Sequence, residues 1–230
     1  MLRWPSNLPP QDVAVDLVPR AIMGPPSMSG SQQAVQSDAG CWYIQYQGIS
    51  VIQSFRIKLW RVMAALLNVV GTPILVPVFD CKQTPWPLDA SGHRVFRYDA
   101  VPHSDGAFFS DGSGYATRVV DIASDAFAAA GATSIDILVT NAGELTGGEF
   151  FSTDDGHLYV ITTVETLVSS SDTYRIGVAP PLRNAISAGA HLEFENPVCR
   201  CVLDNPNSMS LMLTQRIVGR PSLTFVEDFS

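Results

Sequence analysis

The histidines and cysteines are the side chains of this sequence with the most obvious potential for metal or acid-base chemistry. None of the four histidines stands in the HExxH or HxxEH setting of zinc enzymes, and no two cysteines have the C-x2-C spacing usual in zinc sites. We therefore expect no metal and no cofactor. The alternative is a metal site on Cys199 and Cys201. Its further ligands would come from Cys41, Cys81, His93 and His103.

Cys199 and Cys201 are two residues apart, so on a β-strand they project to the same face. Four irregularly spaced cysteines do not form a disulfide framework in a chain of this length. In a reducing compartment we expect this pair to act as small buried apolar side chains.

Carboxylates are the second group with catalytic potential, because glycosidases use two of them across a cleft. Candidates are Asp105, Asp111, Asp154 and Glu195, but nothing in the sequence indicates that any two of them meet. The chain also lacks a G-x-S-x-G elbow, a Walker loop and a G-x-G-x-x-G fingerprint. We expect that the protein is not an enzyme, and a hydrolase with an unrecognised site is our third hypothesis.

Residues 103–114 contain the triplet Ser-Asp-Gly twice, together with further serines and glycines. Asp-Gly pairs favour turns, because Asp bonds its own backbone and Gly accepts positive φ. The spacing does not match the calcium loop D-x-[DN]-x-[DN]-G. We interpret the tract as a loop.

Four aromatic side chains near this tract are candidates for ligand binding. They lie beside polar loop residues, where aromatic rings could stack on sugar rings or anchor a subunit interface. Both interpretations stay open on the sequence alone. The four residues are Trp86, Phe108, Phe109 and Tyr115.

Composition excludes several classes of protein. The net charge is −8, and the 14 basic residues are spread singly along the chain, so nucleic-acid binding is not expected. No window approaches the ~18 to 20 apolar residues of a membrane span, and the N-terminus lacks the pattern of a signal peptide. We expect synthesis in a cytoplasm and no membrane insertion.

Charged residues make up only 16% of the chain, against roughly 25% in an average domain. Such a surface suits a subunit covered by neighbours, because burying charge is costly.

The chain divides into three expected parts. Residues 1–20 carry four prolines and no sustained periodicity, which indicates an extended N-terminal arm that wraps a neighbour or lies over its own domain. Residues 21–80 and 196–230 are expected to form a β-sandwich, and residues 81–195 an inserted loop region with a small β-barrel. The predicted fold class is mostly β.

A single helix is predicted over 55–70. Its apolar residues recur at helical spacing, Ser54 can cap its start, and Gly71 with Pro73 ends it. The predicted apolar face consists of Leu59, Val62, Met63, Leu66, Leu67 and Val70.

Strands are predicted wherever β-branched and aromatic runs lie between turn signals. A hairpin or meander is expected over 41–52, with turns near 38–40 and 47–48, followed by an edge strand over 72–79. The later predicted strands are 115–122, 134–140, 149–151, 157–164, 173–179, 191–194, 198–203, 209–218 and 222–226.

This order of hairpin, single helix, edge strand, long insertion and final meander resembles the distal tail proteins of long-tailed bacteriophages, which form part of the tail tip or baseplate. The segments that carry the resemblance are 55–77, 102–114, 148–160, 180–194, 196–200 and 224–229. It implies a tail-tube-like sandwich with one flanking helix and an inserted barrel. A neighbouring baseplate subunit or minor tail protein matches equally well.

The resemblance further implies a structural virion protein located at the tail tip. It would form a ring, expected as a hexamer, that joins the tail tube protein to the baseplate hub and fibre proteins. Ring closure would pair the exposed sheet edges of each copy. The runner-up hypothesis, from another class, is a carbohydrate-binding or host-recognition module.

Overall fold

The computed structural model describes residues 1–23, 34–69, 71–79, 83–96, 105–107, 109–110, 118–167, 172–214 and 217–229, without the side chains of residues 20–23, 34–39 and 206. In this part of the chain, three β-sheets accompany a single α-helix, which confirms the mostly β class. No helix there is both long enough and apolar enough to span a membrane.

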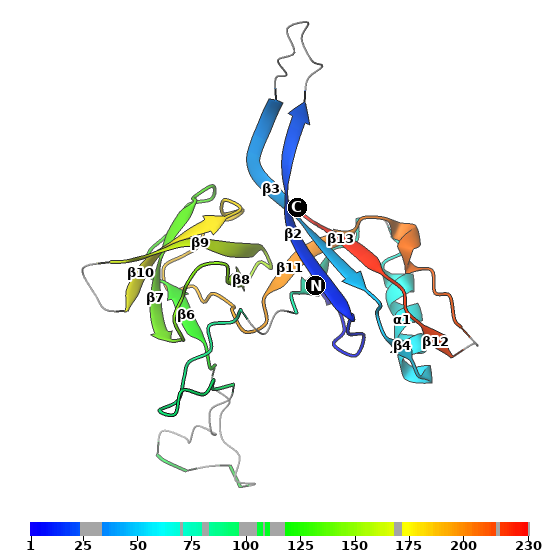
Figure 1. Ribbon diagram of the computed structural model, residues 1–230, viewed down its shortest axis with the longest axis horizontal. Coiled ribbons are helices and arrows are strands. Elements are labelled where there is room, and N and C mark those ends of the chain that lie inside the picture. The colour runs from blue at the N-terminus through cyan, green and yellow to red at the C-terminus, as the bar shows by residue number, and fades with distance from the viewer. Residues whose placement is uncertain are drawn as a thin grey trace, which may run out of the picture. The chain divides into compact units, whose positions relative to one another are not determined.

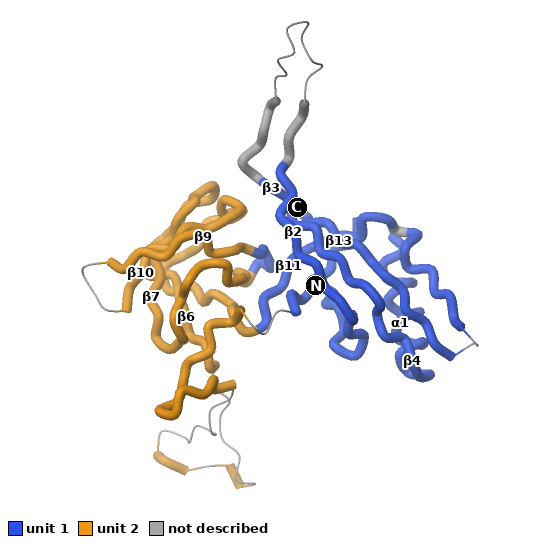
Figure 2. Tube along the Cα trace, in the orientation of Figure 1, with its two compact units in different colours: residues 1–79, 155–158, 196–230 blue, residues 80–154, 159–195 orange. Residues whose placement is uncertain are grey.

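The chain folds into two compact units, coloured separately in Figure 2. Unit 1 comprises residues 1–79, 155–158 and 196–230, and unit 2 comprises residues 80–154 and 159–195. The sequence analysis expected 81–195 to form one continuous insertion, whereas residues 155–158 belong to unit 1.

Unit 1 is built on a six-stranded sheet (Figure 1). Neighbouring strands are antiparallel except β1 and β5, which are parallel. In spatial order, the strands are β1 (Leu2–Arg3), β5 (Ile74–Pro77), β11 (Val198–Leu203), β13 (Leu223–Glu227), β3 (Ala34–Gln47) and β2 (Asp12–Met23).

Residues 1–20, expected as an arm outside the sandwich that wraps a neighbour or lies over its own domain, instead belong to this sheet and its core, since β1 pairs with β5 and β2 with β3. Trp4 is buried, and its ring packs edge-on against Tyr46, Trp60 and Phe225 with centroid distances of 5.8, 6.1 and 5.5 Å. A proline-rich segment has little intrinsic periodicity, but here the burial of Trp4 and Leu8 holds it against the core.

β3 runs through the Asp-Ala-Gly signal at 38–40, where the sequence predicted a turn. The register between β2 and β3 shifts there, from Val18 opposite Cys41 to Arg20 opposite Ser37, which is a β-bulge. A side chain on Gly40 would meet the side chain of Leu17 at 2.8 Å, so glycine suits this close approach.

The helix α1 (Ser54–Leu66) lies next to the short strand β4 (Val51–Ile52), which pairs with β12 (Val218–Gly219). The predicted cap is wrong, because Gln53 occupies the N-cap position and makes no side-chain cap. The predicted apolar face is only partly correct. Trp60, Met63 and Leu67 are buried, but Val62 and Leu66 are exposed.

The strand predicted over 209–218 is wrong for 209–213, while Thr214 bridges to Val218, Val218 begins β12, and residues 215–216 lie outside the described part of the chain. A 3-10 helix, η1 (Pro206–Met209), begins where the Asn205 side chain accepts a hydrogen bond from the Asn207 backbone N–H at 2.9 Å. The indole N–H of Trp60 then donates to the Met209 carbonyl at 3.0 Å. That carbonyl is therefore engaged by a side chain instead of a strand partner.

Unit 2 contains an antiparallel five-stranded sheet whose core includes stacked aromatic rings. The Phe151 ring lies 5.4 Å from Tyr159 and 5.3 Å from Phe194. In spatial order the strands are β6 (Asp121–Ser124), β7 (Ser134–Asn141), β10 (Thr173–Ala179), β9 (Leu158–Thr166) and β8 (Phe150–Ser152).

Both outer strands of this sheet are contacted by one later segment. His191 bridges to Ala123 on β6, and Glu193 bridges to Ser152 on β8. The predicted strand over 191–194 is therefore reduced to two isolated bridges that span the sheet's two edges.

Candidate functional site

Two neighbouring hollows of unit 2, together called the groove, are lined in part by the segment that leaves β7. Their volumes are about 790 and 450 Å³, and both are lined by Gly143, Glu144 and Thr146. Such volumes lie within the range of small-ligand sites. The larger hollow also includes Asp172 and Tyr174 at the start of β10, and the smaller one includes Trp86, Arg94 and Glu149.

Glu149 fixes the conformation of the neighbouring loop residues Thr146 and Gly147, which line the groove. Its carboxylate accepts hydrogen bonds from the Thr146 N–H at 2.9 Å, the Thr146 hydroxyl at 2.9 Å and the Gly147 N–H at 2.8 Å. Because Glu149 is buried and these bonds are local, the loop 144–149 has a defined shape before any ligand binds. Glu149 is thus a positioning residue for the groove.

Gly143 allows the segment with Trp86 to lie directly against this loop. The Gly143 N–H donates to the Pro85 carbonyl at 2.8 Å, and a Cβ at Gly143 would stand only 2.4 Å from the Trp86 carbonyl oxygen. Any side chain here would push the two segments apart. Trp86 also packs against the core of unit 2 and lies edge-on to Phe96, with ring centroids 5.2 Å apart.

Each of the two hollows is lined by one large aromatic side chain and by carboxylates. Tyr174 lines one hollow and Trp86 the other, and both are half-buried against the core. The lining residues include the carboxylates of Glu144, Glu149 and Asp172 but only one cation, Arg94. The groove is therefore acidic on balance.

Of the four aromatic candidates from the sequence, Trp86 lies in this groove. Phe109 is 43% exposed and is not among the lining residues. Phe108 and Tyr115 lie outside the described residues. Sequence reasoning missed Tyr174, and the available signal was an aromatic residue between polar Thr173 and Arg175 at the start of the predicted strand 173–179.

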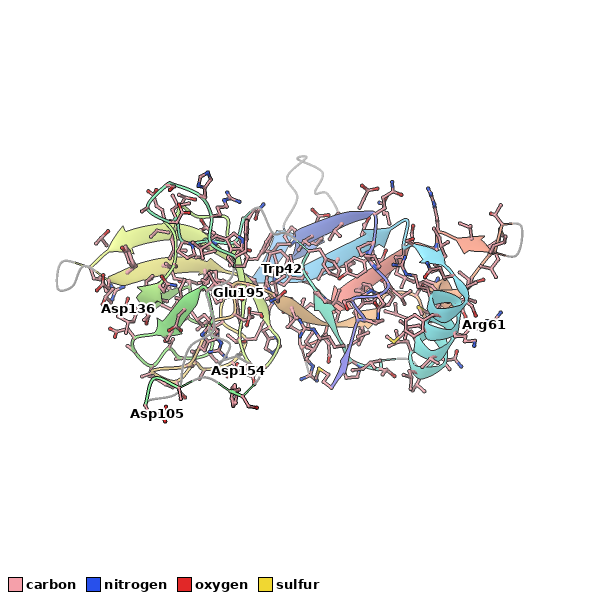
Figure 3. All side chains as sticks on the ribbon, turned by 90° about the horizontal axis from the view of Figure 1, so that it is seen from below. Trp42, Arg61, Asp105, Asp136, Asp154 and Glu195 are labelled. Atoms are coloured by element: carbon pink, nitrogen blue, oxygen red, sulfur yellow. The ribbon has the colours of Figure 1, made fainter. Side chains whose placement is uncertain are left out.

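The carboxylates considered for catalysis are at separate positions in unit 2. Figure 3 labels Asp105, Asp154 and Glu195, which do not meet. Glu195 accepts hydrogen bonds from the backbone N–H groups of Val119 and Val120 at 2.6 and 2.9 Å, and Asp105 accepts one from Ala107 at 3.0 Å. Asp111 lies outside the described residues.

Unit 1 contains a second group of chemically interesting side chains, but it is buried. His157 Nδ1 has no hydrogen-bond partner and lies 3.9 Å from Glu227 Oε1, while Glu227 Oε2 accepts the Trp42 backbone N–H at 3.1 Å. Cys199 and Cys201 are fully buried, as expected. Burial, with the neighbouring Cys201 thiol, raises the pKa of Cys199, so its thiol stays protonated and a poor nucleophile.

Within the described residues, no group of three or more His, Cys, Asp or Glu side chains is placed to hold a metal ion. His93 lies beside Asp89 on the surface of unit 2, and Cys41 is buried in unit 1. Cys81 and His103 lie outside the described residues.

A third feature is an exposed apolar face around α1 in unit 1. Phe55, Val62 and Leu66 follow one another at helical spacing and are 60, 54 and 49% exposed. α1 also carries three cations and no acid. Further exposed apolar residues in this part of unit 1 are Ile52, Val69, Met212 and Ile217.

No protein-family model matches the chain, and no curated protein shows a significant sequence match to it.

Proposed function

We propose that this chain is a non-enzymatic structural subunit of a phage tail tip, which assembles through unit 1 into a ring of identical copies. The ring would join the tail tube protein to the baseplate hub and fibre proteins. In this proposal unit 1 is the tail-tube-like sandwich and unit 2 the inserted small barrel. The bridges from His191 and Glu193 to the two edge strands of unit 2 support barrel closure.

The observation that carries the proposal is the exposed apolar face of α1. Monomeric proteins seldom expose a continuous apolar surface, and such a surface commonly marks an interface. Phe55, Val62 and Leu66 lie on one side of the helix, while the opposite side already packs into unit 1 through Trp60 and Met63. A partner is therefore needed to cover the outer side.

A second copy of the chain is the partner that the charges favour. α1 carries Arg56, Lys58 and Arg61, whereas β2, the outermost strand of the six-stranded sheet, carries exposed Asp12 and Asp16. A head-to-tail contact would bring the cationic helix of one copy to the acidic edge strand of the next. Contacts between two different surfaces close into rings when the rotation between copies permits.

The mass of the full chain in solution tests this proposal. We expect light scattering to give a multiple of the 24.8 kDa subunit, with six copies for a hexamer. Phe55→Glu should shift the mass toward a single subunit. Phe127→Glu is the matched control, because Phe127 is equally apolar, 67% exposed and located in unit 2.

A monomer at every concentration, or equal effects of both substitutions, would contradict assembly through α1. The place in the virion needs its own test. Immunogold labelling of phage particles that contain this chain should mark the end of the tail, and labelling of the capsid or of no particle would reject the tail-tip assignment.

The runner-up hypothesis of a carbohydrate-binding module is favoured by a different observation, the groove of unit 2, and does not conflict with assembly by unit 1. No contact among the described residues favours the hydrolase hypothesis, because Glu195 and Asp105 already cap backbone N–H groups at separate places.

A further inference from the structure

We propose that the groove of unit 2 is a binding site for a neutral oligosaccharide. This site is independent of the assembly proposed for unit 1, since every residue that lines it belongs to unit 2. The argument rests on the pair of neighbouring hollows, on their lining and on their rigidity.

Two neighbouring hollows, each lined by a large aromatic side chain, suit a chain of sugars better than a single small molecule. Both hollows are lined by Gly143, Glu144 and Thr146, while Tyr174 lines the larger one and Trp86 the smaller one. A ligand that filled both would have to contact an aromatic ring in each hollow. Successive units of an oligosaccharide offer such repeated contacts.

The lining combines the two kinds of group that sugars require. The faces of pyranose rings carry C–H groups that pack on aromatic rings, as Tyr174 and Trp86 could provide. Their hydroxyls donate hydrogen bonds to carboxylates, and Glu144 and Asp172 supply carboxylates beside Tyr174. A lipid or a strongly apolar ligand would leave these polar groups without water or partners, which is costly.

The charge of the groove selects against anionic ligands. Three lining carboxylates face a single arginine, Arg94, so a phosphate, a sulfated glycan or a nucleic acid would be repelled. A basic peptide would satisfy the charge. However, peptides in grooves usually add a strand to a sheet edge or insert side chains into apolar pockets, and the residues that line this groove are mainly polar.

The groove is also largely preformed, which lowers the entropic cost of binding. Glu149 fixes Thr146 and Gly147, and the contact of Gly143 with the Pro85–Trp86 backbone fixes Trp86 relative to this loop. Preorganised sites bind more tightly for the same contacts.

Binding of the full chain to a printed array of neutral oligosaccharides tests the proposal, with the best glycan then titrated by calorimetry. Tyr174→Ala should lower the affinity about tenfold, the effect of losing one good stacking contact. Glu144→Gln, which preserves size, should lower it by a smaller factor. Phe127→Ala is the matched control, because Phe127 is exposed in unit 2 but does not line the groove.

Three results would overturn the proposal. They are binding to no neutral glycan of the array, unchanged affinity in both Tyr174→Ala and Glu144→Gln, and tighter binding to heparin or to an oligolysine peptide than to any neutral glycan. Each variant should form an assembly with the same number of subunits as the wild type, as measured by light scattering. Failure of glycan binding therefore leaves the assembly proposal intact, and loss of assembly in Phe55→Glu leaves the groove untouched.

Discussion

Unit 1 and unit 2 differ at the edges of their main β-sheets. Among the described residues, one edge of the sheet of unit 1 is β2, a strand of twelve residues that pairs with β3 on one side and with no strand on the other. The outer strands of unit 2 are instead both bridged by the segment 191–193. An open strand edge favours association, whereas an occupied edge favours a module that stays separate.

The exposed surfaces of the two units also differ in polarity. Unit 1 exposes apolar side chains beside cations on α1, while unit 2 offers a polar, acidic groove with aromatic rings. In our two proposals, unit 1 forms the assembly and unit 2 binds a ligand, and this contrast is consistent with both. The following experiments test this contrast, beginning with the largest expected effect.

Phe151→Ala should show whether the two units are energetically independent. Phe151 is fully buried between Tyr159 and Phe194 in unit 2, so its loss should cost about 3 to 5 kcal/mol. Calorimetry should show a lower unfolding temperature for unit 2 and an unchanged transition for unit 1. A single transition that shifts as a whole would mean that the units unfold together.

Glu227→Ala should have the corresponding effect on unit 1. It would leave the Trp42 N–H and the neighbouring His157 buried without the carboxylate, at a cost of about 3 kcal/mol. Glu227→Gln is the control, since its amide oxygen can still accept from Trp42, and it should cost less. Urea unfolding followed by tryptophan fluorescence measures both. Equal losses would show that the charge matters more than the hydrogen bond.

Gly143→Ala should destabilise unit 2 around the groove through a steric clash. Its added Cβ would be 2.4 Å from the Trp86 carbonyl oxygen, and relieving this clash should cost about 1 to 3 kcal/mol and reduce glycan binding. Gly148→Ala separates the causes, because Gly148 has open space but a φ of +96°, so its cost of about 1 kcal/mol is conformational. Thermal unfolding of both variants should place Gly143→Ala lower.

Arg61→Glu should weaken assembly through charge alone. Arg61 is exposed on α1, where Figure 3 labels it, and the proposed partner surface carries Asp16. We expect association to weaken by up to about tenfold, with partial recovery in the double variant Arg61→Glu with Asp16→Arg. Sedimentation equilibrium measures the effect. Additive weakening in the double variant would separate the helix from the β2 edge.

The smallest effect is expected for the surface pair Asp136–Arg175 of unit 2. Arg175 Nε donates to Asp136 Oδ1 at 2.7 Å, which lowers the pKa of Asp136 below its ordinary value. The stabilisation is therefore present above the unfolded-state pKa and is lost as the pH falls through the lower folded-state pKa. Asp136→Asn should slightly reduce the unfolding temperature at neutral pH and have less effect in strong acid. An equal loss at both pH values would contradict this sign.

Much of the secondary structure was predictable because it depends on local patterns. Strands predicted over 173–179 and 198–203 have the same bounds as β10 and β11. The existence of α1 followed from the apolar periodicity of 55–70. Local patterns failed where a distant partner decided the outcome, as for the N-terminal segment, whose Trp4 packs on Tyr46, Trp60 and Phe225.

The candidate sites were predictable only in part. Trp86 was identified from its type and polar surroundings, but Tyr174 and Glu144 are thirty residues apart and come together because β10 pairs with β7. Similarly, periodicity reveals which α1 residues are apolar, yet it does not reveal which of them the rest of unit 1 covers.

The sequence by itself determined the mostly β class, the single helix and the low surface charge, since these depend on residue type and short-range spacing. Only the tertiary structure decided which apolar side chains remain exposed, which sheet edge stays open and which residues line the groove. These properties depend on contacts between segments far apart in the chain, and short-range patterns carry no information about such contacts.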